Sequence, residues 1–248
     1  MKTILTVRNL RKIYHTKESE TLAVDNFSFT LNEGEIIAIV GPSGCGKSTI
    51  LNMIGGLIDI TEGSIEKDEN IKLGYMLQED ALFSFRNILD NCKLGLEIGK
   101  KITKDDLDYI NNLLKKYGLE DFKKSYPENL SGGMRQRVAL IRTLATRPNV
   151  ILLDEAFSAL DFQTRLVLVD DVYSIIKEEN KSCIMITHNI EEAVSMADKV
   201  IVLSDRTSII KNIYNIDFVN KSIPSQNRKN INFMDYCEKI WKDIDINV

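Results

Sequence analysis

Residues 41–48 read Gly-Pro-Ser-Gly-Cys-Gly-Lys-Ser, and this stretch decides the fold class. Its spacing, G-x-x-x-x-G-K-S/T, is typical of a phosphate-binding loop. An apolar run at 36–40 precedes the loop and another at 50–54 follows it, which predicts a strand before the loop and a helix after it. A glycine-rich turn that arose by chance would not be expected to match all four specified positions of the motif in that context. The sequence therefore predicts a site for a nucleoside triphosphate.

The residue types of the loop suit the binding of phosphate. Glycines let the backbone curve closely enough to aim N–H groups at phosphate oxygens, and the following helix adds the positive end of its dipole. We expect Lys47 to reach the β- and γ-phosphates of ATP and the Ser48 hydroxyl to bind Mg²⁺. The predicted nucleotide contacts of the loop are Gly41, Pro42, Ser43, Gly44, Cys45, Gly46, Lys47, Ser48 and Thr49.

The composition is that of an ordinary globular protein. The chain has 248 residues and a formal net charge of −4, which argues against nucleic-acid binding by the chain as a whole. Its length suffices for one large α/β domain or for a core with an inserted subdomain. We expect no signal peptide, and no apolar stretch approaches the ~18 residues needed to cross a bilayer. Action at a membrane would therefore require a partner.

The four cysteines are far apart in the sequence, at Cys45, Cys92, Cys183 and Cys237. Their spacing fits neither a zinc site nor a disulfide framework, so we expect reduced thiols. Cys45 lies inside the phosphate loop, where the helix N-terminus would lower the pKa of its thiol and make it reactive. A small, unreactive side chain is the alternative, and the sequence leaves both interpretations open.

Hydrophobic periodicity predicts the elements around the loop. Partial alternation at 5–10 and 22–31 predicts strands of an antiparallel N-terminal sheet. Further strands are expected at 35–40, 71–77, 150–153, 183–187 and 200–203, alternating with helices, and this order predicts a mainly parallel sheet.

The remaining segments add helices. The segment 80–146 is mainly helical, with Thr103 and Asp106 as a capping box and Gly118 as a stop signal. We expect one domain over 1–248, with a nucleotide-binding core at 1–79 and 147–205, a helical subdomain at 80–146 and a C-terminal extension at 206–248. In the extension Phe233, Tyr236, Cys237 and Ile240 have helical spacing, which favours packing against the core over binding of a partner.

Two acidic residues follow a buried strand in the sequence Val-Ile-Leu-Leu-Asp-Glu at 150–155. The carboxyl ends of such strands are where α/β sheets bind their ligands. Asp154 can hold Mg²⁺ there, and Glu155 can accept a proton from the attacking water. A strand that ends in an acidic turn is the alternative, but it is disfavoured downstream of a phosphate loop.

A third motif, Leu-Ser-Gly-Gly-Met-Arg-Gln-Arg, occupies residues 130–137. Ser131 is a good N-cap, and apolar residues follow it at helical spacing. Two glycines in the first turn would lower the stability of the helix, by about 1 kcal/mol each in a helix interior and less near its end. They make sense if another group must approach that backbone closely.

The segment 130–137 resembles the signature motif of ABC-type ATPases, and the resemblance covers residues 1–203. The other motifs stand in the family's order: Gln78 as the glutamine loop, Asp154 with Glu155, Ser158-Ala159-Leu160-Asp161 as the D-loop, and His188 as the switch histidine. The resemblance implies a P-loop NTPase core with a mainly parallel sheet, an N-terminal antiparallel β subdomain and an inserted helical subdomain.

The resemblance also implies a head-to-tail homodimer that binds two ATP molecules between its copies. The signature of one copy would face the nucleotide held by the other, through Ser131, Gly132, Gly133 and Gln136, and Asp161 would contact the opposite copy. Gln78 would touch Mg²⁺ and the attacking water. His188 would contact the γ-phosphate and orient Glu155, although a lone histidine after a strand is more often structural.

Tyr14 is a candidate for stacking on adenine, because the segment 10–14 resembles the region where family members often carry such an aromatic residue. An aromatic side chain packed in the sheet is the alternative, and both stay open.

The segment 78–97, QEDALFSFRNILDNCKLGLE, is similar to import ATPases of the nitrate, sulfonate and taurine group. In that group the region after the glutamine loop receives a coupling helix of the membrane subunit. Leu82, Phe83 and Phe85 are therefore candidate contacts, with core packing as the alternative. Ser84 and Phe85 replace the more usual Pro and Trp, which weakens the assignment to a substrate group.

The implied function is that of the ATP-hydrolysing subunit of an importer on the cytoplasmic face of the cell membrane. Its partners would be separate permease subunits and, indirectly, a solute-binding protein. A soluble ABC ATPase that acts on DNA or ribosomes is the competing class, but the chain lacks sustained heptads and a second cassette. A non-hydrolysing sensor is disfavoured because both Glu155 and His188 are present.

Overall fold

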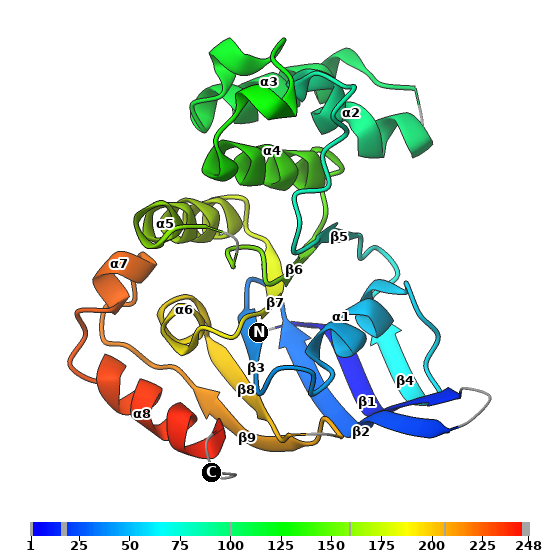
Figure 1. Ribbon diagram of the computed structural model, residues 1–248, viewed down its shortest axis with the longest axis vertical. Coiled ribbons are helices and arrows are strands. Elements are labelled where there is room, and N and C mark those ends of the chain that lie inside the picture. Colours follow the sequence, from blue (N-terminus) through cyan, green and yellow to red (C-terminus); the bar gives the residue numbers. More distant parts are fainter. Residues whose placement is uncertain (1, 16–18, 100, 159, 206, 245–248) are drawn as a thin grey trace. The chain divides into compact units, whose positions relative to one another are not determined.

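The computed structural model describes residues 2–15, 19–99, 101–158, 160–205 and 207–244 (Figure 1). The chain divides into two compact units. The first consists of Met1–Ile71 with Val169–Val248, and the second of Lys72–Leu168. Over the described ranges, no helix is both long enough and apolar enough to span a lipid bilayer.

The first unit contains an antiparallel and a mainly parallel sheet. The antiparallel sheet has the order β2-β1-β4, from β1 (Thr3–His15), β2 (Glu20–Asn32) and β4 (Glu62–Lys67). In the other sheet β7 (Ser182–Ile186), β3 (Ile36–Val40) and β8 (Lys199–Leu203) are parallel neighbours, and β9 (Ile210–Asn215) is an antiparallel edge strand. Every residue of β3 and β7 is buried, as their apolar sequences predict.

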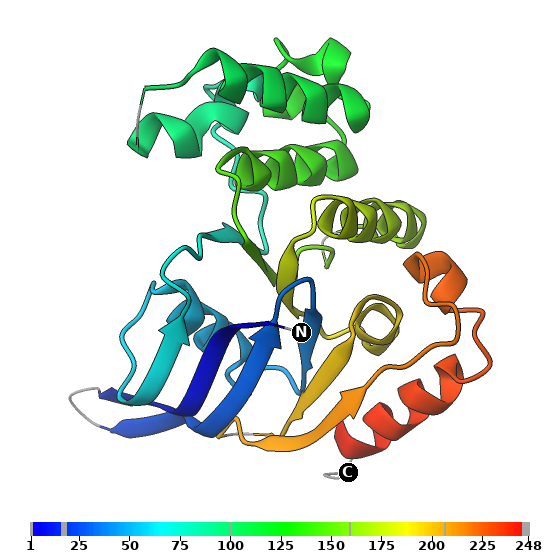
Figure 2. The same cartoon turned by 180° about the vertical axis from the view of Figure 1, so that it is seen from behind.

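The helices of this unit are α1 (Lys47–Gly55), α6 (Ile190–Met196), α7 (Pro224–Asn227) and α8 (Phe233–Ile244). The red helix of Figure 2, α8, packs against α6 and β8. Its buried residues are Phe233, Cys237 and Ile240, and Tyr236 is half-buried. The prediction that the C-terminal extension packs on the core is therefore confirmed.

The second unit combines two strands with a group of helices. The strands β5 (Leu73–Met76) and β6 (Val150–Asp154) are parallel, and α4 (Gly132–Ala145) packs on both α2 (Ile88–Gly99) and α3 (Lys104–Lys116). Short 3-10 turns lie at Glu120–Phe122 and Pro127–Asn129, and α5 (Phe162–Glu178) begins in this unit. The predicted capping box of Thr103 and Asp106 is confirmed, and Gly118 follows α3 with φ +71°.

Two strands escape prediction from the sequence. Four of the six residues of β4 are exposed, and none of the six residues of β9 is fully buried. Both are edge strands, so they lack the regular alternation of buried and exposed residues that reveals a strand in the sequence.

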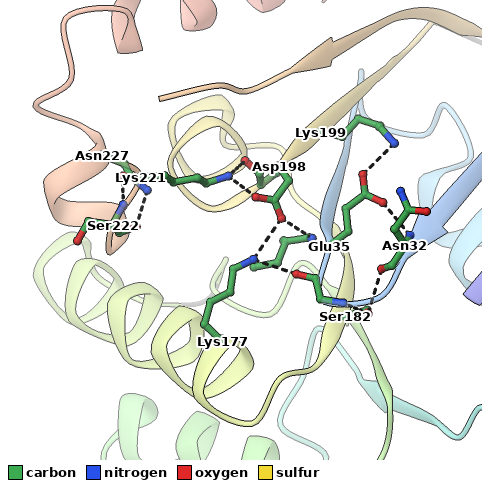
Figure 3. Close-up of polar contacts among 12 residues, drawn as sticks. Asn32, Glu35, Lys177, Ser182, Asp198, Lys199, Lys221, Ser222 and Asn227 are labelled. Carbon is green, nitrogen blue, oxygen red and sulfur yellow. Dashed lines mark hydrogen bonds and ion pairs between the residues drawn. The ribbon is translucent and has the colours of Figure 1, made fainter. Parts of the chain in front are cut away.

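A charged cluster ties the C-terminal extension to the core of the first unit (Figure 3). Asp198 Oδ1 accepts a 2.6 Å hydrogen bond from Lys221, and Oδ2 accepts bonds from the Ile36 amide at 2.8 Å and Lys177 at 3.2 Å. Lys221 also donates to Ala197 O, at the end of α6. Burial alone would raise the pKa of Asp198, but the Lys221 ammonium and the hydrogen bonds outweigh burial and hold this pKa below its ordinary value.

We expect Asp198→Asn to lower the free energy of unfolding at pH 7 by about 1–3 kcal/mol, because Lys221 loses a charged partner in a partly buried place. Since the pKa of Asp198 is depressed in the folded chain, its contribution is present above the ordinary value of 3.8 and is lost as the pH falls through the folded-state pKa. Urea unfolding from pH 7 to pH 2 should show the difference between wild type and variant shrinking in acid.

The matched control is Asp235→Asn, which breaks an exposed ion pair with Lys239 on α8. We expect this control to change stability by less than about 0.5 kcal/mol. A difference between wild type and Asp198→Asn that stays constant down to pH 2 would contradict the assigned role of Asp198.

Candidate nucleotide site

The phosphate loop lies in the first unit, between β3 and α1. Gly44 and Gly46 have φ angles of +76° and +114°, in the region that side chains disfavour. A Cβ on Gly46 would lie 2.5 Å from Ser208 Oγ and 2.9 Å from Ala23 O, so only glycine fits there. The curvature of the loop therefore depends on both glycines, of which the motif specifies Gly46 and leaves position 44 variable.

Lys47 is the first residue of α1 and is 6% exposed. Its ammonium donates to Gly41 O at 2.9 Å and to Pro42 O at 2.8 Å, which holds the charge within the curve of the loop. Ser48 and Thr49 lie in the same first turn, where the backbone N–H groups have no partners inside the helix. An ammonium, a helix N-terminus and hydroxyls form a set that fits a triphosphate with Mg²⁺.

Cys45 corrects one expectation from the sequence. It is 1% exposed, and burial raises the pKa of its thiol, although the nearby Lys47 charge opposes this shift. The hypothesis of a lowered pKa and a reactive thiol is therefore wrong, because the loss of hydration disfavours the thiolate more than nearby positive charge favours it. All four cysteines are free, as predicted.

Two further candidates lie in the first unit. His188 follows β7, which is a parallel neighbour of β3, so His188 and the phosphate loop emerge at the same edge of the sheet. Its side chain is exposed, and Asn189 caps α6 by accepting a 3.1 Å bond from the Glu192 amide, as predicted.

Tyr14, on β1, places its hydroxyl 3.5 Å from Thr49 Oγ1 in the first turn of α1. Its ring is 40% exposed, and the Lys12 ammonium lies 5.1 Å from the ring centre. The ring is thus beside the nucleotide-binding loop and accessible to solvent. Stacking on adenine stays a prediction.

The acidic residues lie in the second unit at the end of β6. Tyr75, on the neighbouring strand β5, donates a 3.3 Å hydrogen bond to Asp154 Oδ2. Burial raises the pKa of the Tyr75 phenol, and the Asp154 charge adds to the shift, so the phenol remains a donor. Tyr75 can thereby orient a carboxylate suited to Mg²⁺. Sequence reasoning missed it, because a tyrosine within a short strand carries no signal of its own.

Glu155 has φ +45°, an uncommon conformation for a residue with a side chain. Its carbonyl accepts bonds from the Ser158 amide at 3.1 Å and the Ser158 hydroxyl at 2.9 Å. Local strain of this kind is frequent at active sites. Asp161, the last residue of the D-loop, accepts from the Thr164 amide at 3.1 Å, and hydrogen bonds from the Thr164 side chain and amide lower the pKa of Asp161. Ala159 lies outside the described residues.

The signature forms the start of α4. Ser131 is its N-cap and accepts a 3.4 Å bond from the Met134 amide, as predicted. A Cβ on Gly133 would lie 2.6 Å from Thr164 Cγ2, so α5 of the same chain already approaches this backbone. Thr164 of the same chain is therefore one reason why position 133 requires glycine.

A pocket of about 600 Å³ joins these motifs within the second unit. Gln78, which is exposed, lines it together with Gly132, Gln136 and Ser158. Gln136 is 4% exposed, so its contact with a nucleotide of a second copy stays a prediction. The structure thus gathers the glutamine loop, the signature and the D-loop in one unit, and the phosphate loop, Tyr14 and His188 in the other.

The fold and these residues define an α/β ATPase of the phosphate-loop class. The family model for ABC transporters matches residues 24–158. An uncharacterized ABC transporter ATP-binding protein of Bacillus subtilis (strain 168) is 40% identical, over 97% of this chain and 95% of its own. A taurine import ATP-binding protein of Jannaschia sp. (strain CCS1) is 35% identical, over 95% of this chain and 92% of its own.

Among solved structures, the dimer of an ATP-binding cassette in a post-hydrolysis state, bound to ADP and Pi, has a TM-score of 0.74. It is 28% identical and covers 87% of this chain and 100% of that one. The chain belongs to the ABC transporter family, and it is an ABC-type ATPase. The predicted family and fold class are confirmed.

Proposed function

We propose that this chain is the ATP-hydrolysing subunit of an importer, bound to the cytoplasmic face of the membrane through separate permease subunits and served indirectly by a solute-binding protein. Relatives named as taurine import ATP-binding proteins support import, and they disfavour a soluble ATPase acting on DNA or ribosomes. The dimeric cassette among the similar structures supports a homodimer as the working form.

Each ATP would be held by the phosphate loop of one copy and the signature of the other. The α1 and α4 N-termini would both direct N–H groups at the γ-phosphate. Ser48, Gln78 and Asp154 would hold Mg²⁺, which supplies positive charge against the charge that develops on the phosphoryl group. Glu155 would take a proton from the attacking water. His188 would orient Glu155 and contact the γ-phosphate.

The observation that carries the import proposal is an exposed aromatic pair. Phe83 and Phe85 are 40% and 74% exposed, and their rings stack with centroids 5.3 Å apart. Neighbouring large apolar side chains on a surface mark a site of interaction. For Phe85 this exposure argues against the alternative of core packing, whereas Leu82 is half-buried. We call residues 82–87 the docking segment.

The docking segment is held in shape from beneath by Asn91 of α2, which is fully buried. Its side-chain amide donates to the carbonyls of Phe83, Arg86 and Asn87 at 3.0–3.1 Å and accepts from the Phe83 amide at 2.8 Å. A loop bonded in this way presents its aromatic rings in a fixed arrangement, which lowers the entropic cost of binding a partner.

We expect Phe85→Ala to weaken binding to the permease about tenfold or more, because exposed aromatic anchors dominate interface energies. The measurement is co-purification of membrane-spanning proteins with the tagged chain from membranes of its own cells, identified by mass spectrometry. ATPase activity of the purified variant should stay within about twofold of wild type, since Phe85 is 74% exposed and belongs to none of the nucleotide-binding motifs.

Trp241→Ala is the matched control, because Trp241 is also an exposed aromatic residue, 52% exposed on α8. It should leave co-purification unchanged. Recovery of ribosomes or DNA with the wild-type chain would overturn the import proposal. Equal permease recovery with Phe85→Ala would remove the docking segment from the interface.

A further inference from the structure

Two arginines of α4 bind the loop that follows Gln78. Arg135, in the first turn of α4, donates from Nε to Asp80 Oδ2 at 2.9 Å. Arg142, in the last turn, donates to Ala81 O and to Asp80 O, both at 2.7 Å. The loop is therefore held at both ends of the helix, and attachment at two separated points prevents it from pivoting about either one.

Arg135 and Asp80 each make a second bond. Arg135 also binds the start of the signature, and Asp80 also binds the docking segment. Arg135 Nη1 donates to Leu130 O at 3.0 Å, directly before the N-cap Ser131. The second oxygen of Asp80, Oδ1, accepts from the amide of Leu82 at 3.2 Å, the first residue of the docking segment. A continuous series of bonds thus runs from the docking segment through Asp80 and Arg135 to the signature.

The chemistry of these bonds suits a fixed connection. The guanidinium group is planar and always charged, and it donates in several fixed directions, so Arg135 can hold a carboxylate and a carbonyl at once. Burial lowers the pKa of Arg142, but arginine stays protonated, and its two bonds go to backbone carbonyls of an irregular segment. Neither arginine is among the residues expected to react.

We propose that Arg135 and Arg142 are positioning residues that make the glutamine loop and the signature helix move as one piece. Asp80 and Leu130 then keep a fixed spacing when nucleotide binds or when the docking segment is displaced. The inference rests on the proposed function, because it explains how occupation of the ATP site reaches the surface offered to the permease. All the bonds on which the inference rests lie within one chain, so the test does not need the permease.

The test is hydrogen–deuterium exchange of the full chain carrying Glu155→Gln, with and without MgATP. With the arginines intact, MgATP should slow exchange of the amides in 79–87 by about threefold or more, because the loop is ordered together with the signature. Adding Arg135→Gln should abolish this response, and binding of a fluorescent ATP analogue to the same variant shows that the phosphate loop, which is unchanged, is still occupied.

Arg135→Lys separates charge from geometry, because lysine keeps the charge but not the planar fork, and it should restore only part of the response. Asp80→Asn gives a second route to the same break without altering α4. The matched control is Arg147→Gln, which breaks an ion pair with Asp105 in the same unit, away from the loop. This control should keep the full response.

An undiminished response in both Arg135→Gln and Asp80→Asn would overturn the proposal. Loss of the response in Arg147→Gln as well would also overturn it, since the effect would then reflect general loosening of the unit. A failure of the import proposal would give a different result. The chain would then bind no permease, but the slowing of exchange by MgATP would still depend on Arg135.

Discussion

Glu155→Gln is expected to lower the rate of ATP hydrolysis by roughly 10²- to 10⁴-fold, the usual contribution of a general base. Glutamine has nearly the same size as glutamate but cannot take a proton from water. The unusual backbone of Glu155 is held by its own carbonyl, through two bonds from Ser158, and these bonds survive the change. The substitution therefore alters the chemistry of the site with little effect on its shape.

Release of phosphate at saturating MgATP measures the loss, and binding of a fluorescent ATP analogue shows whether the site still forms. Affinity should stay within about threefold of wild type, because the phosphate loop and Lys47 are unchanged. Glu69→Gln, at an exposed turn, is the control and should hydrolyse ATP normally. Near-normal turnover of Glu155→Gln would mean that another residue activates the water.

Ser131→Arg is expected to abolish hydrolysis and ATP-dependent association of two copies. The site would receive a long cationic side chain at the place where the signature must approach the γ-phosphate held by the second copy. Ser131 is exposed in the single chain, so the arginine has room and the fold should persist. Part of the effect comes from the lost N-cap bond to Met134, about 1 kcal/mol of helix stability.

Ser131→Ala isolates that part, because it removes the cap without adding bulk. It should lose far less activity than Ser131→Arg. Light scattering in the Glu155→Gln background gives the second measurement: the parent should double from 28.2 kDa when MgATP is added, and the Ser131→Arg derivative should not. Association of that derivative at wild-type ATP concentrations would show that the signature does not face the nucleotide.

The sequence predicted the parts of the fold in which local pattern and tertiary burial agree. The strands β3 and β7 are buried on both faces and therefore appear as apolar runs, and the caps at Thr103, Ser131 and Asn189 follow from short-range chemistry. The edge strands β4 and β9 could not be predicted in this way, because sheet pairing holds them rather than burial.

Within the candidate site, spacing predicted the phosphate loop at 41–48, whereas Gln78, Asp161 and His188 were named from the resemblance to ABC-type ATPases. The residues that support these motifs could not be predicted. Tyr75, Asn91 and Arg135 act through partners between 4 and 79 positions away in the chain, and no sequence motif reveals such pairs. Cys45 was misjudged in one of its two interpretations, because the depth of burial that sets the pKa of a thiol is a tertiary property.

The central claim is that each ATP site combines the phosphate loop of one copy with the signature of another. Mixing two inactive variants, Lys47→Ala and Ser131→Arg, tests it most directly. In a mixed dimer one site pairs the intact loop of the Ser131→Arg copy with the intact signature of the Lys47→Ala copy. Random pairing makes half of the dimers mixed, each with one intact site of two, so the mixture should regain roughly a quarter of wild-type ATPase activity. A mixture no more active than the sum of the separate variants would contradict the shared site.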